Sequence, residues 1–142
     1  LSFIVSVEGK QGHVAYPYKA DNPIPKLTQL VERLSASPLD AGNEHFDPSS
    51  LVFTTFDVGN PAGNVIPSKA TLKFNIRYST EQTYDSLKAL VNGHVEKLYA
   101  ELGGVWSVAF TEGAEAFITE PGAFVGLVAD AIAAETGLVH KL

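Results

Sequence analysis

The stretch ATLKFNIRYSTEQ, residues 70–82, decides the fold of this chain. Apolar and polar side chains alternate along its first nine positions, which predicts a strand with one buried and one open face. The apolar set consists of Ala70, Leu72, Phe74, Ile76 and Tyr78. Ser79 then begins a capping-box pattern with Gln82 three residues later, and this pattern predicts that a helix follows the strand directly.

Further strands and another helix are predicted on both sides of this stretch. The strands alternate or form short apolar runs, and they cover residues 2–9, 51–58 and 105–110. Asn22 can cap a helix that has Pro23 at its first position, and Gly103–Gly104 can end the helix after the quoted stretch. The resulting order β-α-β-β-α-β predicts an α+β, ferredoxin-like fold, in which two helices cover one face of a four-stranded antiparallel sheet.

The pattern divides the chain into two parts. Residues 1–112 complete the predicted sheet and its two helices, whereas residues 113–142 read as a linker and a further helix over 121–136. That helix has an apolar face without a partner in this chain, so we expect it to lead into a neighbouring domain. The chain opens on a strand and contains no methionine, which favours a piece of a longer protein.

Composition excludes several classes of protein. The 142 residues are 45% hydrophobic and 18% charged, which is typical of one globular domain. The net charge of −6 argues against nucleic-acid binding, and no apolar run is long enough for a membrane span. Cysteine is absent, which excludes disulfides and thiolate metal sites, and the histidines lack the spacing of a metal motif. We expect a cytoplasmic protein that binds neither nucleic acid nor membranes, and no metal held by this chain alone.

Three positions are candidates for chemistry. His13 follows Gly12 in the long loop GKQGHVAYPYKADNPI, residues 9–24, where a turn would normally use Asn, Asp or Ser. Asn64 lies in the turn PAGNVIP, and its amide can either donate to a ligand or cap the turn. Arg77 lies on the polar face of the quoted strand, where it can grip a carboxylate with its guanidinium fork or simply be solvated. The residues alone leave both interpretations open at each position.

Taken together, these segments resemble the small inserted domain of the M20 family of zinc amidohydrolases. GHVAYP followed closely by NP is the most specific part of the resemblance, and NVIP followed by a strand that ends in FNIR supports it. The resemblance covers essentially the whole chain. It implies a ferredoxin-like lid that binds substrate and forms a homodimer, and a catalytic domain of the same protein that holds two zinc ions outside this chain.

The resemblance also implies roles for individual residues. His13 matches a catalytic histidine that reaches into the partner subunit's active site and donates a hydrogen bond to the oxyanion formed during amide hydrolysis. Tyr16 matches a substrate-contacting tyrosine, and Asn64 and Arg77 match residues that bind the carboxylates of the substrate. The implied reaction removes the succinyl group from an N-succinylated diamino dicarboxylate, and this chain alone is expected to be inactive.

One position departs from the family pattern. Some members carry a second asparagine directly before the one that matches Asn64, and this chain has Gly63 there. One side-chain contact to the substrate is then absent or is replaced by the backbone. Three alternatives stay open: the lid of another M20 enzyme such as an acetylornithine deacetylase or a carboxypeptidase, a stand-alone ferredoxin-like module that binds a small ligand, and a domain that only dimerises.

Overall fold

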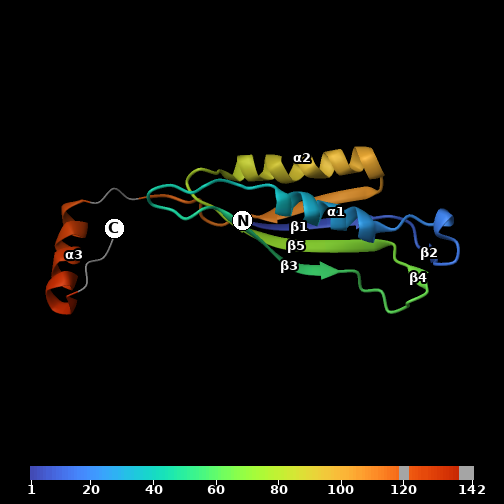
Figure 1. The fold of residues 1–142 in the computed structure, drawn as a ribbon, viewed down its shortest axis with the longest axis horizontal. Coiled ribbons are helices and arrows are strands. Elements are labelled where there is room, and N and C mark those ends of the chain that lie inside the picture. Colours follow the sequence, from blue (N-terminus) through green and yellow to red (C-terminus); the bar gives the residue numbers. More distant parts are fainter. Residues whose placement is uncertain (119–121, 138–142) are drawn as a thin grey trace.

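The structure, a computed structural model, describes residues 1–118 and 122–137. Four strands form an antiparallel sheet in the order β3-β5-β1-β6, with the bounds β1 (Ser2–Glu8), β3 (Ser50–Asp57), β5 (Lys69–Arg77) and β6 (Val105–Thr111). Helices α1 (Pro23–Ala36) and α2 (Tyr84–Leu102) cover one face of this sheet (Figure 1). The predicted class, α+β with two helices on a four-stranded antiparallel sheet, is confirmed, and the arrangement is consistent with a ferredoxin-like fold.

The alternation in the quoted stretch places the core between the sheet and the helices. Phe74 in the middle of β5 stacks on Phe3 of β1, with 5.1 Å between the ring centroids, and meets Phe53 of β3 edge-on at 5.7 Å. The residues of α1 and α2 that face these rings are buried, and they include Leu27, Leu30, Leu34, Leu87, Val91 and Leu98. On the opposite face, β5 carries Lys69, Thr71, Lys73, Asn75 and Arg77, so this strand has one apolar and one polar side, as predicted, whereas the exposed Ile4 interrupts the polar side of β1.

The start of α1 follows the prediction, whereas the start of α2 does not. The side chain of Asn22 accepts a hydrogen bond of 3.0 Å from the backbone of Ile24, which caps α1. The predicted cap of the second helix at Ser79 is wrong, because Ser79 is buried in a turn and α2 begins only at Tyr84. Gln82, the other half of the predicted capping box, instead donates to the carbonyl of Leu39 across the domain.

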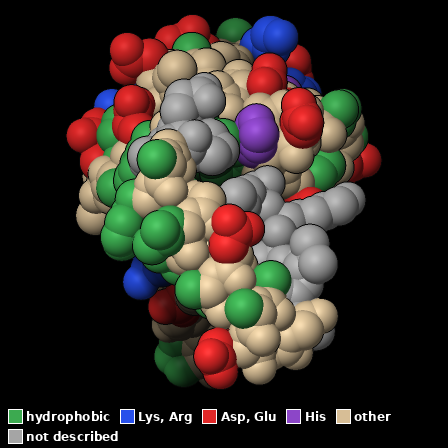
Figure 2. Space-filling model, turned by 90° about the vertical axis from the view of Figure 1, so that its left-hand side faces the viewer, with side chains coloured by type: hydrophobic (Ala, Val, Ile, Leu, Met, Phe, Trp, Pro, Cys, Tyr) green, Lys and Arg blue, Asp and Glu red, His purple; other side chains and the backbone are tan. Residues whose placement is uncertain are grey.

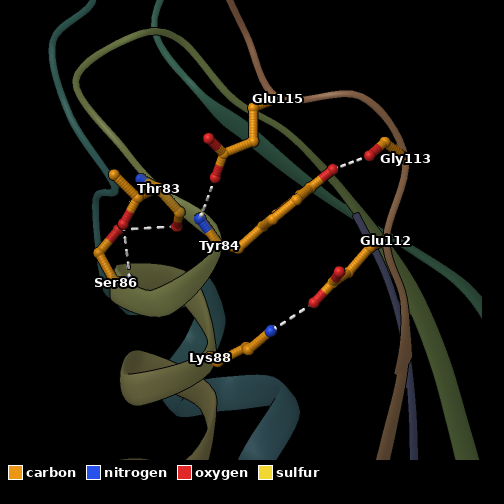
Figure 3. Close-up of polar contacts among 7 residues, drawn as sticks. All are labelled: Thr83, Tyr84, Ser86, Lys88, Glu112, Gly113 and Glu115. Atoms are coloured by element: carbon orange, nitrogen blue, oxygen red, sulfur yellow. Dashed lines mark hydrogen bonds and ion pairs between the residues drawn. The ribbon is translucent and has the colours of Figure 1, made fainter.

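The actual cap of α2 is a reciprocal pair formed by Thr83 and Ser86 (Figure 3). The Thr83 hydroxyl accepts from the backbone N–H of Ser86 at 3.1 Å, and the Ser86 hydroxyl accepts from the backbone N–H of Thr83 at 2.9 Å. The first turn of α2 also holds the chain where it leaves β6. Lys88 Nζ lies 2.5 Å from a carboxylate oxygen of Glu112, and the Tyr84 hydroxyl donates to the carbonyl of Gly113.

We expect Thr83→Ala to destabilise the domain by about 1 kcal/mol, because it removes one of the two reciprocal cap bonds. The midpoint of thermal unfolding, followed by circular dichroism, should fall by about 3–5 °C. Ser35→Ala is the matched control, since Ser35 is an exposed residue of α1 whose hydroxyl only donates to the carbonyl of Val31. Equal shifts for the two variants would contradict the role assigned to the cap.

A third helix follows the sheet and its two covering helices in the sequence. Figure 1 shows α3 (Ala123–Thr136) apart from the sheet and its two helices. Hydrophobic side chains gather along this helix in Figure 2, and the large exposed ones are Phe124, Leu127, Val128 and Ile132. A helix is therefore present within the predicted range 121–136, although residues 119–121 and 138–142 of the predicted extension lie outside the described residues.

The opposite end of the domain carries a small second sheet. There, β2 (Gly12–His13) pairs with β4 (Val65–Ile66), and the short 3-10 helix η1 (Pro17–Lys19) follows β2 (Figure 1). Residues 11–20 leave the domain and return to it between Lys10 and Asp21, whose backbones pair with each other. We refer to residues 11–20 as the arm. It ends directly before the cap of α1.

Candidate functional site

The structure brings three of the four predicted site residues together and leaves the fourth apart. His13, Tyr16 and Asn64 lie at the end of the sheet where β1 finishes and β5 begins (Figure 1). Arg77 is the last residue of β5, at the other end. A strand of nine residues spans roughly 25 Å, so Arg77 and Asn64 cannot contact one small ligand bound to a single chain.

Backbone pairing holds the arm against the turn that contains Asn64. His13 pairs with Val65 in the small ladder, and the backbone N–H of Val14 donates to the carbonyl of Asn64 at 3.1 Å. A side chain at Gly12 would not fit, because its Cβ would lie 2.7 Å from the Cβ of Ala20. Glycine at this position therefore lets the two sides of the arm lie close together.

His13 is exposed and presents a hydrogen-bond donor to its surroundings. Its Nδ1 atom accepts a hydrogen bond of 3.0 Å from the backbone N–H of Ala15. The neutral imidazole then carries its proton on Nε2, because Nδ1 is acting as the acceptor. The ring of Tyr16 lies beside it, with 6.1 Å between the ring centroids. This geometry suits donation to an oxygen that gains negative charge.

Asn64 is not needed to cap its turn, because Asn60 does so. The Asn60 amide donates to the carbonyl of Val65 at 2.8 Å, and its side-chain oxygen accepts from the backbone N–H of Ala62. The amide of Asn64 is exposed and forms no hydrogen bond with any residue that the structure describes. Its side chain is therefore available to a ligand. A Cβ at Gly63 would meet nothing within 4 Å, so the second asparagine of the family pattern would fit here.

The charges around the arm favour an anionic ligand. Lys19 Nζ lies over the ring of Tyr16, 5.1 Å from its centroid, and 5.8 Å from the centroid of Tyr18. The carboxylate of Asp21 is paired with Lys26, and within residues 1–118 and 122–137 no carboxylate forms an ion pair with Lys19. Lys19 therefore places a positive charge without an ion-pair partner beside Tyr16, although the chain has a net charge of −6.

Arg77 lies in a separate cleft of about 420 Å³ at the opposite end of the sheet. His45, Asp47 and Tyr78 also line this cleft, and the guanidinium forms no ion pair with a described carboxylate. Burial raises the pKa of Tyr78 to about 12, so its hydroxyl stays neutral at physiological pH. Because its guanidinium has no ion pair with a described carboxylate, Arg77 can donate hydrogen bonds to a carboxylate from outside this domain.

Sequence reasoning missed the ion pair at the base of the arm. Asp21 and Lys26 were not identified as site residues, although Lys26 lies four positions before the buried Leu30 on the helix face that packs inward. A lysine at such a position needs a counter-charge, and Asp21 just before the helix was the available candidate. That spacing was the signal that could have revealed the pair.

No cluster of three potential metal ligands occurs among residues 1–118 and 122–137. No helix in the same part of the chain is long and apolar enough to cross a membrane. The site therefore consists of donors and cations at two ends of a sheet, without a metal centre built from the described side chains.

The family model of the peptidase dimerisation domain of M20 enzymes matches residues 1–103, and the chain belongs to this family. The resemblance found in the sequence is thereby confirmed. The chain is 49% identical over 142 residues to a succinyl-diaminopimelate desuccinylase of Afipia carboxidovorans, covering 100% of this chain and 37% of the relative. It is 51% identical to the enzyme of the same name from Methylobacterium radiotolerans, covering 97% of this chain and 35% of the relative. The chain thus spans about a third of the length of these relatives.

Solved structures confirm the fold at low sequence identity. A tripeptidase from Staphylococcus aureus superposes with a TM-score of 0.72 at 19% identity, over 96% of this chain and 35% of its own. An amidase of the hydantoinase/carbamoylase family from Burkholderia multivorans gives a TM-score of 0.74 at 16% identity, over 99% of this chain and 33% of its own. In both, the similar region is again about a third of a longer chain.

Proposed function

We propose that this chain is the dimerisation and substrate-binding lid domain of a bacterial, cytoplasmic succinyl-diaminopimelate desuccinylase. The complete enzyme hydrolyses the succinyl amide of N-succinyl-LL-2,6-diaminopimelate, which yields succinate and LL-diaminopimelate for the synthesis of diaminopimelate and lysine. The support is the dimerisation-domain family together with relatives of that name at 45–51% identity. The anionic substrate agrees with the positive charge around His13 and with the free guanidinium of Arg77.

The separation of the two ends of the sheet is the observation that carries the proposal. The N-terminus, which donates to the carbonyl of Ile76, and the exit at Glu112–Gly113 both lie at the Arg77 end. The arm lies at the far end (Figure 1). A catalytic domain joined to this chain at its two ends would sit beside Arg77 and away from His13. We therefore assign Arg77 to the active site of its own subunit and the arm to that of the partner.

The arm contributes hydrogen bonds and charge to this reaction. Two zinc ions held by the catalytic domain supply Lewis-acid chemistry, and none of the described residues of this chain forms a site for them. The Nε2–H of His13 donates to the oxygen of the scissile amide as that oxygen becomes an oxyanion. Asn64 and Tyr16 orient the substrate, Arg77 grips a carboxylate, and Lys19 adds positive charge next to Tyr16.

We place the boundary of the lid near residue 112 and assign residues 113–142 to the path back into the catalytic domain. The contacts of Tyr84 and Lys88 with Gly113 and Glu112 support this boundary, because they hold the chain against α2 directly after β6 (Figure 3). Beyond that point, α3 exposes the apolar side chains that Figure 2 shows. Docking on the catalytic domain would bury them.

The proposed substrate is tested with the full-length, zinc-loaded protein. We expect hydrolysis of N-succinyl-LL-2,6-diaminopimelate with a kcat/KM well above that for N-acetylornithine or for a dipeptide. The isolated 142-residue chain should show no hydrolysis with added zinc. Preference for N-acetylornithine or a peptide would identify the lid of another M20 enzyme, and activity of the isolated chain would contradict the proposal.

A stand-alone module that binds a small ligand makes a different prediction. Amino acids or dicarboxylates would then raise the thermal unfolding midpoint of the isolated chain without any catalytic domain. We expect no such shift, because Arg77 and the arm lie too far apart to share a ligand within one chain. A shift of several degrees at millimolar ligand would favour the module over the lid.

A further inference from the structure

The arm that carries His13 is fixed at its base by one ion pair. Lys26 Nζ lies 2.6 Å from the carboxylate of Asp21, and the side chain of Lys26 is only 9% exposed. Lysine is among the residues least often buried, because its ammonium loses hydration unless a counter-charge replaces the water. The Asp21 side chain is 43% exposed. The lysine of the pair is therefore buried at the base of the arm, and the carboxylate remains partly in contact with solvent.

Asp21 joins the arm to the domain through its backbone as well as its side chain. Its carbonyl accepts from the N–H of Lys10 at 2.8 Å, and its N–H donates to the carbonyl of Lys10 at 2.9 Å. Gly9 is required beside this contact, since a Cβ there would lie 2.0 Å from the carbonyl oxygen of Asp21. The two ends of the arm therefore meet at Asp21. Lys26 connects this meeting point to the first turns of α1, because Asn22 and Pro23 start that helix directly after Asp21.

Beyond its base, the arm is joined to the domain by the two-residue ladder of Gly12 and His13 with β4 and by the bond from the N–H of Val14 to the carbonyl of Asn64. The His13 ring is held locally by the N–H of Ala15, and Tyr16 and Tyr18 are exposed. The position of the ring relative to the domain therefore depends on these few backbone bonds and on the base of the arm. An oxyanion donor is sensitive to this position, because displacements of about 1 Å can lower a rate by up to two orders of magnitude.

We propose that the Asp21–Lys26 ion pair is a positioning device that aims His13 at the oxyanion. This inference rests on the proposed function of His13. Asp21 and Lys26 touch neither substrate nor metal in this assignment, and they act only by holding the base of the arm in one orientation. Breaking the pair should lower kcat far more than it raises KM, because Tyr16 moves with the arm whereas Asn64 and Arg77 keep their own supports.

The test uses the full-length zinc enzyme with the Lys26→Met variant, which keeps the length and apolar stem of the side chain but removes its charge. We expect kcat to fall roughly 10-fold with KM within about 2-fold, and amide hydrogen exchange in the arm to increase. Arg33→Met is the matched control, since Arg33 also lies on α1 and its ion pair, with Glu101 of α2, involves no residue of the arm. It should leave kcat unchanged. Asp21→Asn repeats the test from the other partner and guards against misfolding of Lys26→Met.

The decisive measurement is the effect of Lys26→Met in a His13→Ala background. If the pair acts through His13, Lys26→Met should cause no further loss of kcat there, whereas independent effects would multiply. The same loss of kcat in both backgrounds would overturn the positioning role of the pair. Unchanged kcat in Lys26→Met and Asp21→Asn, with His13→Ala still impaired, would overturn it too, and either result would leave the catalytic role of His13 standing. Unchanged kcat in His13→Ala itself would overturn the proposed catalytic role of His13 and this inference with it.

Discussion

In the full-length enzyme, His13→Ala should lower kcat by about 100-fold and leave KM within a few-fold, because the lost hydrogen bond forms only as the oxyanion develops. The structure supports a donor at this position, since Nδ1 of His13 accepts from the backbone N–H of Ala15 and leaves the proton on Nε2. Steady-state kinetics with N-succinyl-LL-2,6-diaminopimelate measure both constants. Removal of a single oxyanion donor sets the expected size of the effect.

His94→Ala is the control for this prediction, and it should leave kcat unchanged. His94 lies on α2, where its Nε2 is 3.4 Å from the Ser37 hydroxyl, and it belongs to neither end of the proposed site. His13→Gln adds a second comparison, because its amide can still donate and should recover part of the lost kcat. A rise in KM without a fall in kcat for His13→Ala would mean that His13 binds the ground state, and the assignment as an oxyanion donor would then be wrong.

The sequence predicted those elements whose signals are local. Asn22 and Pro23 lie next to the helix they start, and the alternation around Phe74 follows directly from the two-residue period of a strand. The start of α2 was wrong because a distant contact decided it. A capping box would pair the backbone N–H of Ser79 with the side-chain oxygen of Gln82. That N–H instead donates to the hydroxyl of Ser49, 30 positions away, and the Gln82 oxygen accepts from the hydroxyl of Ser86. Local patterns cannot report such a competition.

The candidate site was predictable in its residues and less so in its arrangement. His13, Tyr16 and Asn64 entered through the resemblance to M20 lids, and pattern alone left each of them ambiguous. The two-residue ladder that joins His13 to Val65 is too short to leave a periodic signal. The distance of Arg77 does follow from the strand order, since His13 comes after β1 and Arg77 ends the antiparallel β5. The assignment of Arg77 and His13 to two different active sites also requires the positions of both chain ends, which the sequence pattern does not give.

Two impaired variants should restore each other's activity when they are combined in one dimer. Arg77→Ala alone should lower kcat/KM by roughly 10- to 100-fold, the cost of one charge-assisted bond to a carboxylate. In a heterodimer of Arg77→Ala and His13→Ala subunits, one active site would receive an intact Arg77 from its own subunit and an intact His13 from the partner. A purified heterodimer, isolated with two affinity tags, should therefore show about half of the wild-type kcat per dimer, because one of two symmetric sites is complete.

A heterodimer of His13→Ala and Asn64→Ala subunits is the matched control, because both residues lie at the arm end of the sheet. Each active site would then lack either the His13 or the Asn64 side chain, and no activity should return. The contrast between the two heterodimers follows from the length of β5, which places Arg77 roughly 25 Å from the arm end of the sheet, and from the two chain ends, which lie at the Arg77 end. If the Arg77→Ala and His13→Ala heterodimer stayed as impaired as its parents, both ends of the lid would serve the same active site. The division of this domain between two active sites would then be wrong.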